Sequence, residues 1–259
     1  MGALTWAKRS IAKCLTPFRT RTGFERLQTI GKGWHNLKNL LPTIGRRATA
    51  GVLMHLITIA SGPYVNWIPS LIENRNNYCN KHGYTWQITS DVLPGVHAAF
   101  AKIGAILDAF KAGHEQVFWI DADAAITNFE FNIKGLAQAP FVVSRCRTHP
   151  ICTGVFIAQD HPVIIDFLER MWAEREVHQR PPWEQGVIIR RWNEIAHHAI
   201  ILEKRKLNSS SRDWQFGDFI YHAIGTRNPN RKWRQLRRWL QPRGISPASS
   251  SSQSSRAPC

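Results

Sequence analysis

Two carboxylates, Asp121 and Asp123, follow the apolar run 116–120 in the stretch Phe118-Trp-Ile-Asp121-Ala-Asp123. The run predicts a buried strand, and in open α/β sheets ligands bind at the carboxyl ends of such strands. Two carboxylates two residues apart repel each other unless a cation lies between them. Because hard divalent cations prefer oxygen ligands, the pair indicates a metal site. The alternative is an acidic loop that only caps the next segment.

A second candidate group lies in Phe216-Gly-Asp-Phe-Ile-Tyr-His222-Ala-Ile-Gly225-Thr-Arg227. His222 follows a short apolar strand and could add an imidazole ligand to the metal. Gly225 would let the backbone approach phosphates, and Arg227 could give them a charge-assisted contact. Taken alone, His222 could equally be a buried core histidine. Its combination with Asp121 and Asp123 favours the ligand interpretation.

The segments that would position these residues alternate between strand and helix. Apolar and β-branched runs predict strands over 51–60, 84–89, 116–120, 141–144 and 154–158. Apolar residues at helical spacing predict helices over 65–82, 98–111 and 161–176, the last with Asp160 as its cap. This alternation predicts an α/β fold with a largely parallel sheet.

Charge is distributed unevenly along the 259 residues, which carry 34 Lys and Arg against 18 Asp and Glu, a formal net charge of +16. Residues 1–49 contain ten basic side chains and one acid, and residues 227–259 contain eight and none. The middle is nearly neutral, which argues against a nucleic-acid-binding core. We expect a basic extension over 1–49, a catalytic domain over 50–227, and a basic segment with a Ser-rich tail over 228–259.

The stretch 231–240, RKWRQLRRWL, places Trp233, Leu236, Trp239 and Leu240 on one helical face. Such a helix could dock on the domain or lie in a lipid headgroup layer, and the sequence leaves both open. An RNA-binding tail is a further alternative, because basic and aromatic residues together also suit nucleic acid.

In their order and spacing, several motifs together resemble glycosyltransferase family 34, the retaining galactosyl-, mannosyl- and xylosyltransferases. The matching pieces are Arg75-x-x-Tyr78-x-x-x-His82-Gly83-Tyr84, Lys102, Trp119-Ile-Asp121-Ala-Asp123, a Gly154-containing strand, Trp183-Glu184-Gln185, and Gly217-Asp218-Phe219 with His222-x-x-Gly225. The resemblance covers residues 51–226. It implies a GT-A-like, Rossmann-type domain that transfers a hexose or pentose from a nucleoside-diphosphate sugar to a glycan, lipid or protein.

The resemblance also implies roles for individual positions. Asp121, Asp123 and His222 would bind Mn²⁺ or Mg²⁺. The first strand end, with Thr58, Ala60 and Ser61, would receive the nucleotide of a UDP- or GDP-sugar. Lys102, Gly225 and Arg227 would lie near the diphosphate. One departure is Cys152-Thr153-Gly154, where the family usually has Asn before the glycine strand.

Glu184 and Gln185 occupy the place of the family's acid–amide pair beside the reacting sugar carbon. Retention needs either a carboxylate nucleophile, for which Glu184 is the candidate, or attack by the acceptor from the leaving-group face. We favour the second route, with the leaving phosphate as base and Gln185 shielding the other face. The alternative is a helix N-terminal turn, because Pro181-Pro182 precedes the pair and acids favour that position.

Two other functions stay open. In a haloacid-dehalogenase-like phosphohydrolase Asp121 would be the nucleophile, but the pair comes late in the domain and Ala125 replaces the usual Thr or Val. In a non-catalytic protein the basic tails would bind membrane or RNA. The sequence shows no membrane span, no secretory signal and no zinc-like cysteine spacing. We therefore expect reduced thiols and a cytoplasmic enzyme that its basic tails could hold at a membrane surface. An organelle transit peptide is the alternative for the N-terminus.

Overall fold

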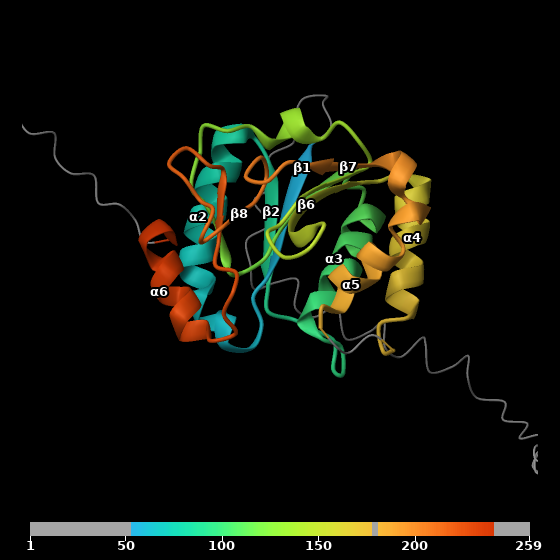
Figure 1. Cartoon of the computed structure of the whole chain (residues 1–259), viewed down its shortest axis with the longest axis horizontal. Coiled ribbons are helices and arrows are strands. Elements are labelled where there is room, and N and C mark those ends of the chain that lie inside the picture. The colour runs from blue at the N-terminus through green and yellow to red at the C-terminus, as the bar shows by residue number, and fades with distance from the viewer. Residues whose placement is uncertain (1–52, 178–180, 241–259) are drawn as a thin grey trace, which may run out of the picture. The chain divides into compact units, whose positions relative to one another are not determined.

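A central sheet organises the part of the chain that the computed structural model describes, residues 53–177 and 181–240 (Figure 1). Its six strands are β1 (Met54–Ile59), β2 (Thr85–Thr89), β3 (Gln116–Ile120), β5 (Phe141–Ser144), β6 (Cys152–Gln159) and β7 (Ala199–Leu202). They lie in the order β2-β1-β3-β6-β5-β7. Only β6 runs antiparallel to its neighbours. The predicted α/β fold with a mostly parallel sheet is confirmed.

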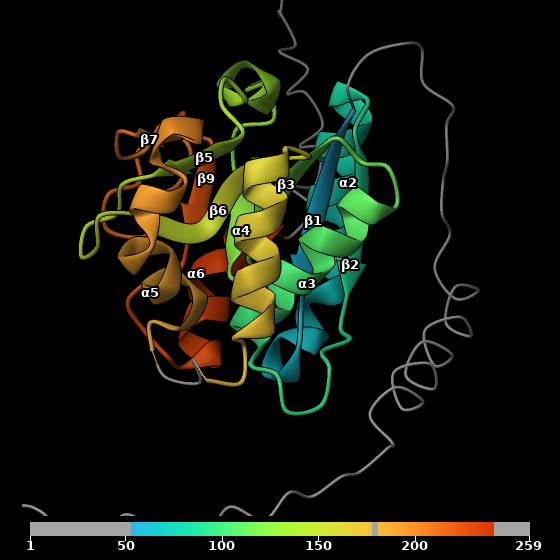
Figure 2. The same ribbon diagram turned by 90° about the vertical axis from the view of Figure 1, so that its right-hand side faces the viewer.

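Helices cover both faces of this sheet (Figures 1 and 2). On one face lie α3 (Ala98–Lys111), α4 (Pro162–Ala173) and α5 (Trp183–Arg190), and on the other lie α2 (Ile68–His82) and α6 (Pro229–Leu240). Alternate side chains of β3 enter the two resulting cores, since successive strand residues point to opposite faces. Val117 and Trp119 pack toward α3 and α4, whereas Phe118 and Ile120 pack toward α2.

Helix boundaries follow local chemistry. The predicted helix 65–82 divides into a 3-10 turn, Gly62–Trp67, and α2, and Gly83 ends α2 with a φ of 71°. That left-handed conformation suits glycine, which has no Cβ. The expected cap at Asp160 is wrong: His161 is the N-cap of α4, and its Nδ1 accepts from the Val163 N–H at 3.3 Å.

A second, three-stranded sheet of very short strands lies beside the first. It contains β4 (Ala124–Ile126), β9 (Ile220–His222) and β8 (Ser209–Ser210), in the order β4-β9-β8. β4 and β9 are antiparallel, with Ala124 opposite His222, and the Ala223 N–H donates to the Asp123 carbonyl at 2.9 Å. This pairing joins the segment after β3 to the segment that carries His222.

The basic helix α6 is docked on the domain. Leu236 and Leu240 are buried in a cluster with Leu71 and Trp67, and the rings of Trp67 and Trp233 lie 5.3 Å apart. The sequence left open whether this helix docks on the domain or lies in a lipid headgroup layer. Docking is the arrangement observed, and protein covers the apolar face of α6. No helix in the described part of the chain is long and apolar enough to cross a bilayer. The expected basic extension and Ser-rich tail fall on residues outside the described ranges.

A buried histidine near the start of β1, His55, predicts an acid-sensitive fold. The His55 and His114 rings stack at 3.8 Å, and His55 Nδ1 lies 2.7 Å from Thr85 Oγ1. Burial, helped by the neighbouring His114, lowers the pKa of His55 from 6.5 to about 3. As the pH falls below 6.5, the unfolded chain takes up this proton before the folded chain does, so stability is lost progressively between pH 6.5 and 3.

We expect His55 to remove roughly 2–3 kcal/mol of folding free energy between pH 7 and pH 4.5. In His55→Gln this part of the loss should disappear from denaturant unfolding curves recorded across that range. The exposed His197→Gln is the matched control and should keep the wild-type pH profile. An unchanged profile in His55→Gln would contradict the assignment.

Candidate active site

Three side chains with metal-binding chemistry meet at the carboxyl end of β3. Asp121 follows β3, Asp123 precedes β4, and His222 ends β9, and their ligand atoms all lie within 4.8 Å of one another. His222 Nε2 is 3.1 Å from Asp123 Oδ1. The sequence placed these three residues together as metal ligands. The structure brings them into one cluster, although Asp123 and His222 are 99 positions apart.

Gly154 on β6 makes room for this cluster. A Cβ added there would lie 2.1 Å from His222 Cε1 and 2.9 Å from Asp121 Oδ2, distances that no real Cβ tolerates. Only glycine at this position therefore lets the strand pass beneath both side chains. The two carboxylates and the imidazole above Gly154 are a donor set that suits Mn²⁺ or Mg²⁺.

Lys102 on α3 connects the cluster to α5. Its ammonium is buried, 3.1 Å from Asp121 Oδ1 and 2.8 Å from Glu184 Oε1, and it donates to the Thr153 carbonyl at 3.0 Å. Burial by itself would lower the pKa of Lys102, but the two carboxylates raise it above its ordinary value. Lys102 is therefore a permanent cation shared by two acids. Because it and the Trp119 indole N–H both engage Asp121 Oδ1, Oδ2 is left to face Gly154.

A second buried cation, Arg75 on α2, holds the backbone of the acidic loop. Its side chain has no exposed surface, and Nη2 donates to the Ala124 carbonyl at 2.7 Å and to the Asp121 carbonyl at 3.3 Å. Asn74 beside it bonds both the N–H and the C=O of Ile126. These contacts fix the chain on both sides of Asp123. The sequence motif contained Arg75, but the motif alone gave it no role.

A third cation reaches the cluster from α6. Lys232 Nζ pairs with Asp123 Oδ2, and its ammonium lies 5.7 Å from the centre of the Tyr64 ring. Burial raises the pKa of Asp123, but the neighbouring His222 and Lys232 outweigh it and hold that pKa well below its usual range. Lys232 was not predicted as a site residue from the sequence, because it is one of many basic residues in its stretch. Its place directly before Trp233, on the docking face, was the available signal.

The remaining predicted site residues differ in their exposure. Thr58 and Ala60 are completely buried at the end of β1, with the Thr58 hydroxyl donating to the Ile120 carbonyl, and Ser61 is partly exposed. Gly225 has a φ of 97° and is exposed, as is Arg227. Arg227 has no ion-pair partner within the described ranges.

The predicted acid–amide pair lies on the first turn of α5, against β6. Glu184 is 3% exposed, and its Oε1 accepts from Thr153 Oγ1 at 2.8 Å in addition to Lys102. Gln185 is partly exposed, and its Oε1 accepts from the Thr153 N–H at 3.2 Å. The pair lies in the first turn of a helix, as the preceding Pro181-Pro182 predicted, and it adjoins the cluster. Its role beside the reacting sugar carbon stays a prediction.

Residues 52–140 match the model of the galactosyl transferase GMA12/MNN10 family, which is glycosyltransferase family 34. The chain is an enzyme of the glycosyltransferase class. The matched segment runs from β1 past β4 and contains Arg75, Lys102, Asp121 and Asp123. The resemblance to family 34 is thereby confirmed, and the phosphohydrolase and non-catalytic alternatives are set aside.

One solved structure agrees on the fold. The glycosyltransferase involved in the glycosylation of the major capsid of PBCV-1 has a TM-score of 0.62 at 17% identity, over 71% of this chain and 99% of its own. GlyE of Streptococcus pneumoniae TIGR4 is more distant, with a TM-score of 0.48 at 12% identity over 71% and 60% of the two chains. A Drosophila β-1,4-galactosyltransferase 7 mutant, solved with manganese, UDP-Gal and xylobiose, has a TM-score of 0.43 at 8% identity over 68% and 72%. No curated protein matches this chain in sequence.

A substitution at Gly154 gives a direct test of the Asp121–Asp123–His222 cluster. In Gly154→Ala the new methyl must displace His222 or Asp121, so we expect Mn²⁺ affinity to fall more than tenfold, a loss of at least about 1.4 kcal/mol. Isothermal titration calorimetry on the folded variant measures this affinity.

Gly135→Ala is the matched control, because a Cβ at Gly135 would meet nothing within 4 Å. It should bind Mn²⁺ as the wild type does. Wild-type affinity in Gly154→Ala would show that His222 and Asp121 do not hold the metal together.

Proposed function

We propose that this glycosyltransferase moves a hexose or pentose from a UDP- or GDP-sugar to a glycan or other hydroxyl acceptor, with retention of configuration and with a divalent metal. The observation that carries the proposal is the Asp121–Asp123–His222 cluster over Gly154. It lies at the carboxyl end of β3, where open α/β sheets bind nucleotides.

Asp121, Asp123 and His222 are the residues that would hold Mn²⁺ or Mg²⁺. When bound, the metal supplies charge neutralisation for the nucleoside diphosphate that leaves. The protein contributes the rest of the arrangement. Lys102 occupies Asp121 Oδ1, and the carbonyl bonds of Arg75 keep the loop from moving as charge changes around it.

The donor would enter at the end of β1. Ser61 is the partly exposed residue there, while Thr58 and Ala60 support that end from below the surface. Gly225 and Arg227 lie just after His222. The exposed Arg227 guanidinium has no ion-pair partner among the described residues, so it is available for a charge-assisted contact with the diphosphate. Lys232 is a further cation for the same group.

The surroundings of Glu184 favour same-face attack. A nucleophilic carboxylate needs access to the sugar, but Glu184 is buried, and its Oε1 is held by Lys102 and Thr153. In the proposed reaction the bond between the anomeric carbon and the phosphate oxygen breaks, and the acceptor oxygen bonds to that carbon from the same face. The acceptor proton passes to the leaving phosphate. Gln185 would shield the opposite face.

A panel of UDP- and GDP-sugars, with and without Mn²⁺, tests the proposal by thermal shift and donor hydrolysis. One nucleotide sugar at 100 times its Kd should add about 2.7 kcal/mol and raise Tm by roughly 5–10 °C, only with the metal. Asp123→Asn should abolish this shift, and the exposed Asp108→Asn should retain it. No response to any donor by folded wild-type protein would refute the function.

Substitution of Lys232 should change the affinities for metal and for nucleotide in opposite directions. In Lys232→Met the ammonium no longer competes for Asp123, so Mn²⁺ alone should bind several-fold more tightly. At saturating Mn²⁺, the affinity for UDP or GDP should fall roughly tenfold, because a charged contact to the diphosphate is lost. Calorimetry measures both constants.

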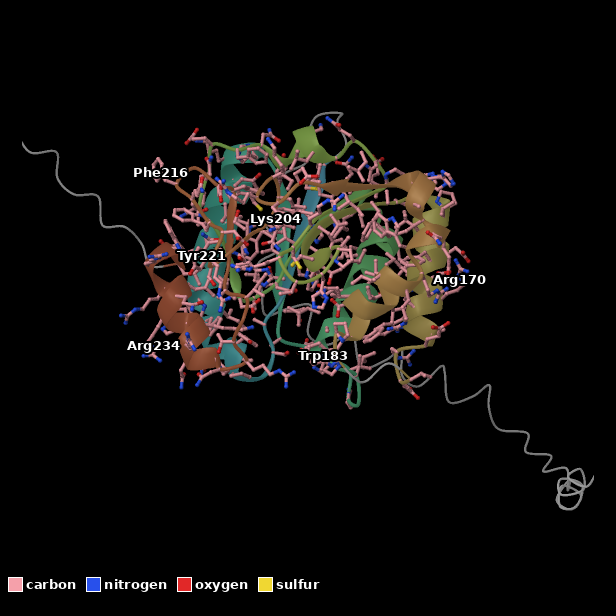
Figure 3. All side chains as sticks on the ribbon, in the orientation of Figure 1. Arg170, Trp183, Lys204, Phe216, Tyr221 and Arg234 are labelled. Carbon is pink, nitrogen blue, oxygen red and sulfur yellow. The ribbon has the colours of Figure 1, made fainter. Side chains whose placement is uncertain are left out.

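Arg234→Met removes a cation from α6 that points away from the domain (Figure 3) and should change neither constant. Equal losses of metal and nucleotide affinity in Lys232→Met would mean that Lys232 only supports the fold of the site.

A further inference from the structure

A pocket rich in positive charge lies beyond β6, at the carboxyl ends of β5 and β7. Four cationic side chains line it: Arg145 and Arg147 after β5, and Lys204 and Arg205 after β7. Asp213 is the one acidic side chain in its lining. The two loops are joined by a hydrogen bond from the Arg145 N–H to the Leu202 carbonyl at 2.9 Å. This concentration of charge is local, because the surrounding domain is nearly neutral.

Most of this charge is available to a ligand. Arg147 and Lys204 are exposed, and neither has an ion-pair partner within the described ranges. Arg145 lies 3.4 Å from Glu203 in an exposed pair, which contributes little. Arg205 donates two hydrogen bonds to Asp218, from Nη2 to Oδ1 at 2.7 Å and from Nε to Oδ2 at 2.9 Å. These bonds hold its guanidinium in place at one side of the pocket.

The side chain of Asn208 links this pocket to the metal cluster. It is 6% exposed, and its Nδ2 lies 3.2 Å from His222 Nδ1 and 3.1 Å from Cys152 Sγ. Its Oδ1 is buried and has no hydrogen-bond partner in the described part of the chain. Buried polar atoms are almost always bonded. Because Asn208 lines the pocket, a ligand there that donates a hydrogen bond, as a sugar hydroxyl does, would satisfy this oxygen.

We propose that this pocket is the acceptor subsite, and that the acceptor is a sugar carrying an anionic group, either a phosphate or a carboxylate. The inference rests on the proposed function. The donor enters at β1, on one side of β3, and the pocket lies on the other side of β3, next to His222. A sugar hydroxyl bonded to Asn208 thus lies beside the cluster, while Arg147 and Lys204 bind the anion.

Cys146 offers a readout of the pocket that does not depend on activity. It lines the pocket and is partly exposed, whereas Cys79 and Cys152 are buried. Iodoacetate is anionic and iodoacetamide is neutral, and the thiolate attacks both and displaces iodide, so the ratio of their rates reports local charge and not thiol pKa. Mass spectrometry of the peptide containing Cys146, in the full chain, gives this ratio.

We expect the iodoacetate-to-iodoacetamide ratio at Cys146 to exceed that of a free cysteine peptide. It should fall several-fold in the double variant Arg147→Gln, Lys204→Gln. Arg234→Gln, Arg237→Gln is the matched control, since both residues are exposed on α6. A ratio equal to that of the free peptide, or one unchanged in the double variant, would overturn the anion-selective pocket.

Transfer assays then identify the acceptor class, with a hexose 6-phosphate, a uronic acid and the neutral hexose as probes. We expect one or both anionic sugars to be preferred to the neutral hexose roughly tenfold or more, and this preference to be lost in the double variant. The two anionic probes distinguish phosphate from carboxylate. Nucleotide-sugar Kd is measured on each variant in parallel.

Three results would overturn the inference. If donor binding is metal-dependent but the neutral hexose is used equally well, the acceptor assignment fails and the proposed function stands. If the double variant loses donor affinity and keeps its acceptor preference, the anionic group belongs to the donor. If no donor binds at all, the proposed function fails, and the acceptor subsite fails with it.

Discussion

The balance of charge around the carboxyl end of β3 is the constraint on which this structure depends. Asp121, Asp123 and Glu184 lie in or near the buried interior, and an uncompensated buried charge is strongly destabilising. Each acid has a cation, with Lys102 shared between Asp121 and Glu184, and Lys232 paired with Asp123. The cations come from α3 and α6, which lie on opposite faces of the sheet. The two helical layers are therefore tied to each other through the site.

The two lysines differ in how many carboxylates they hold, and this difference matters when a ligand binds. Lys102 is enclosed and keeps two carboxylates, whereas Lys232 is on the last described helix and holds only Asp123. Lys102 is thus a structural cation, whereas in the proposed function Lys232 would turn from Asp123 to the diphosphate when a metal takes its place on that carboxylate. Arg75 completes the arrangement, because it bonds backbone carbonyls and so fixes the loop whichever ligand is present.

The two halves of the sheet have different chemistry because of β6. Reversing that strand places Gly154 under the metal cluster and separates the β1 end from the ends of β5 and β7. The first side is the proposed place of the nucleotide. The second carries Arg147 and Lys204, which have no ion-pair partner among the described residues, and the Asn208 oxygen, which has no hydrogen-bond partner there. A transferase needs two adjacent substrates, and in the proposed function β6, the antiparallel strand of the six-stranded sheet, would lie between them.

The sequence by itself determined the elements whose patterns are local. The helix 98–111 and the strand 116–120 were predicted with the observed bounds, and Asp121 and Asp123 were found because they follow that strand directly. The tertiary structure alone decided the contacts of Lys232, Asn208 and Gly154. Strands of two or three residues, such as β8 and β9, have no periodicity to detect. Their pairing, and the cations that reach the cluster from distant helices, depend on packing between segments far apart in the chain.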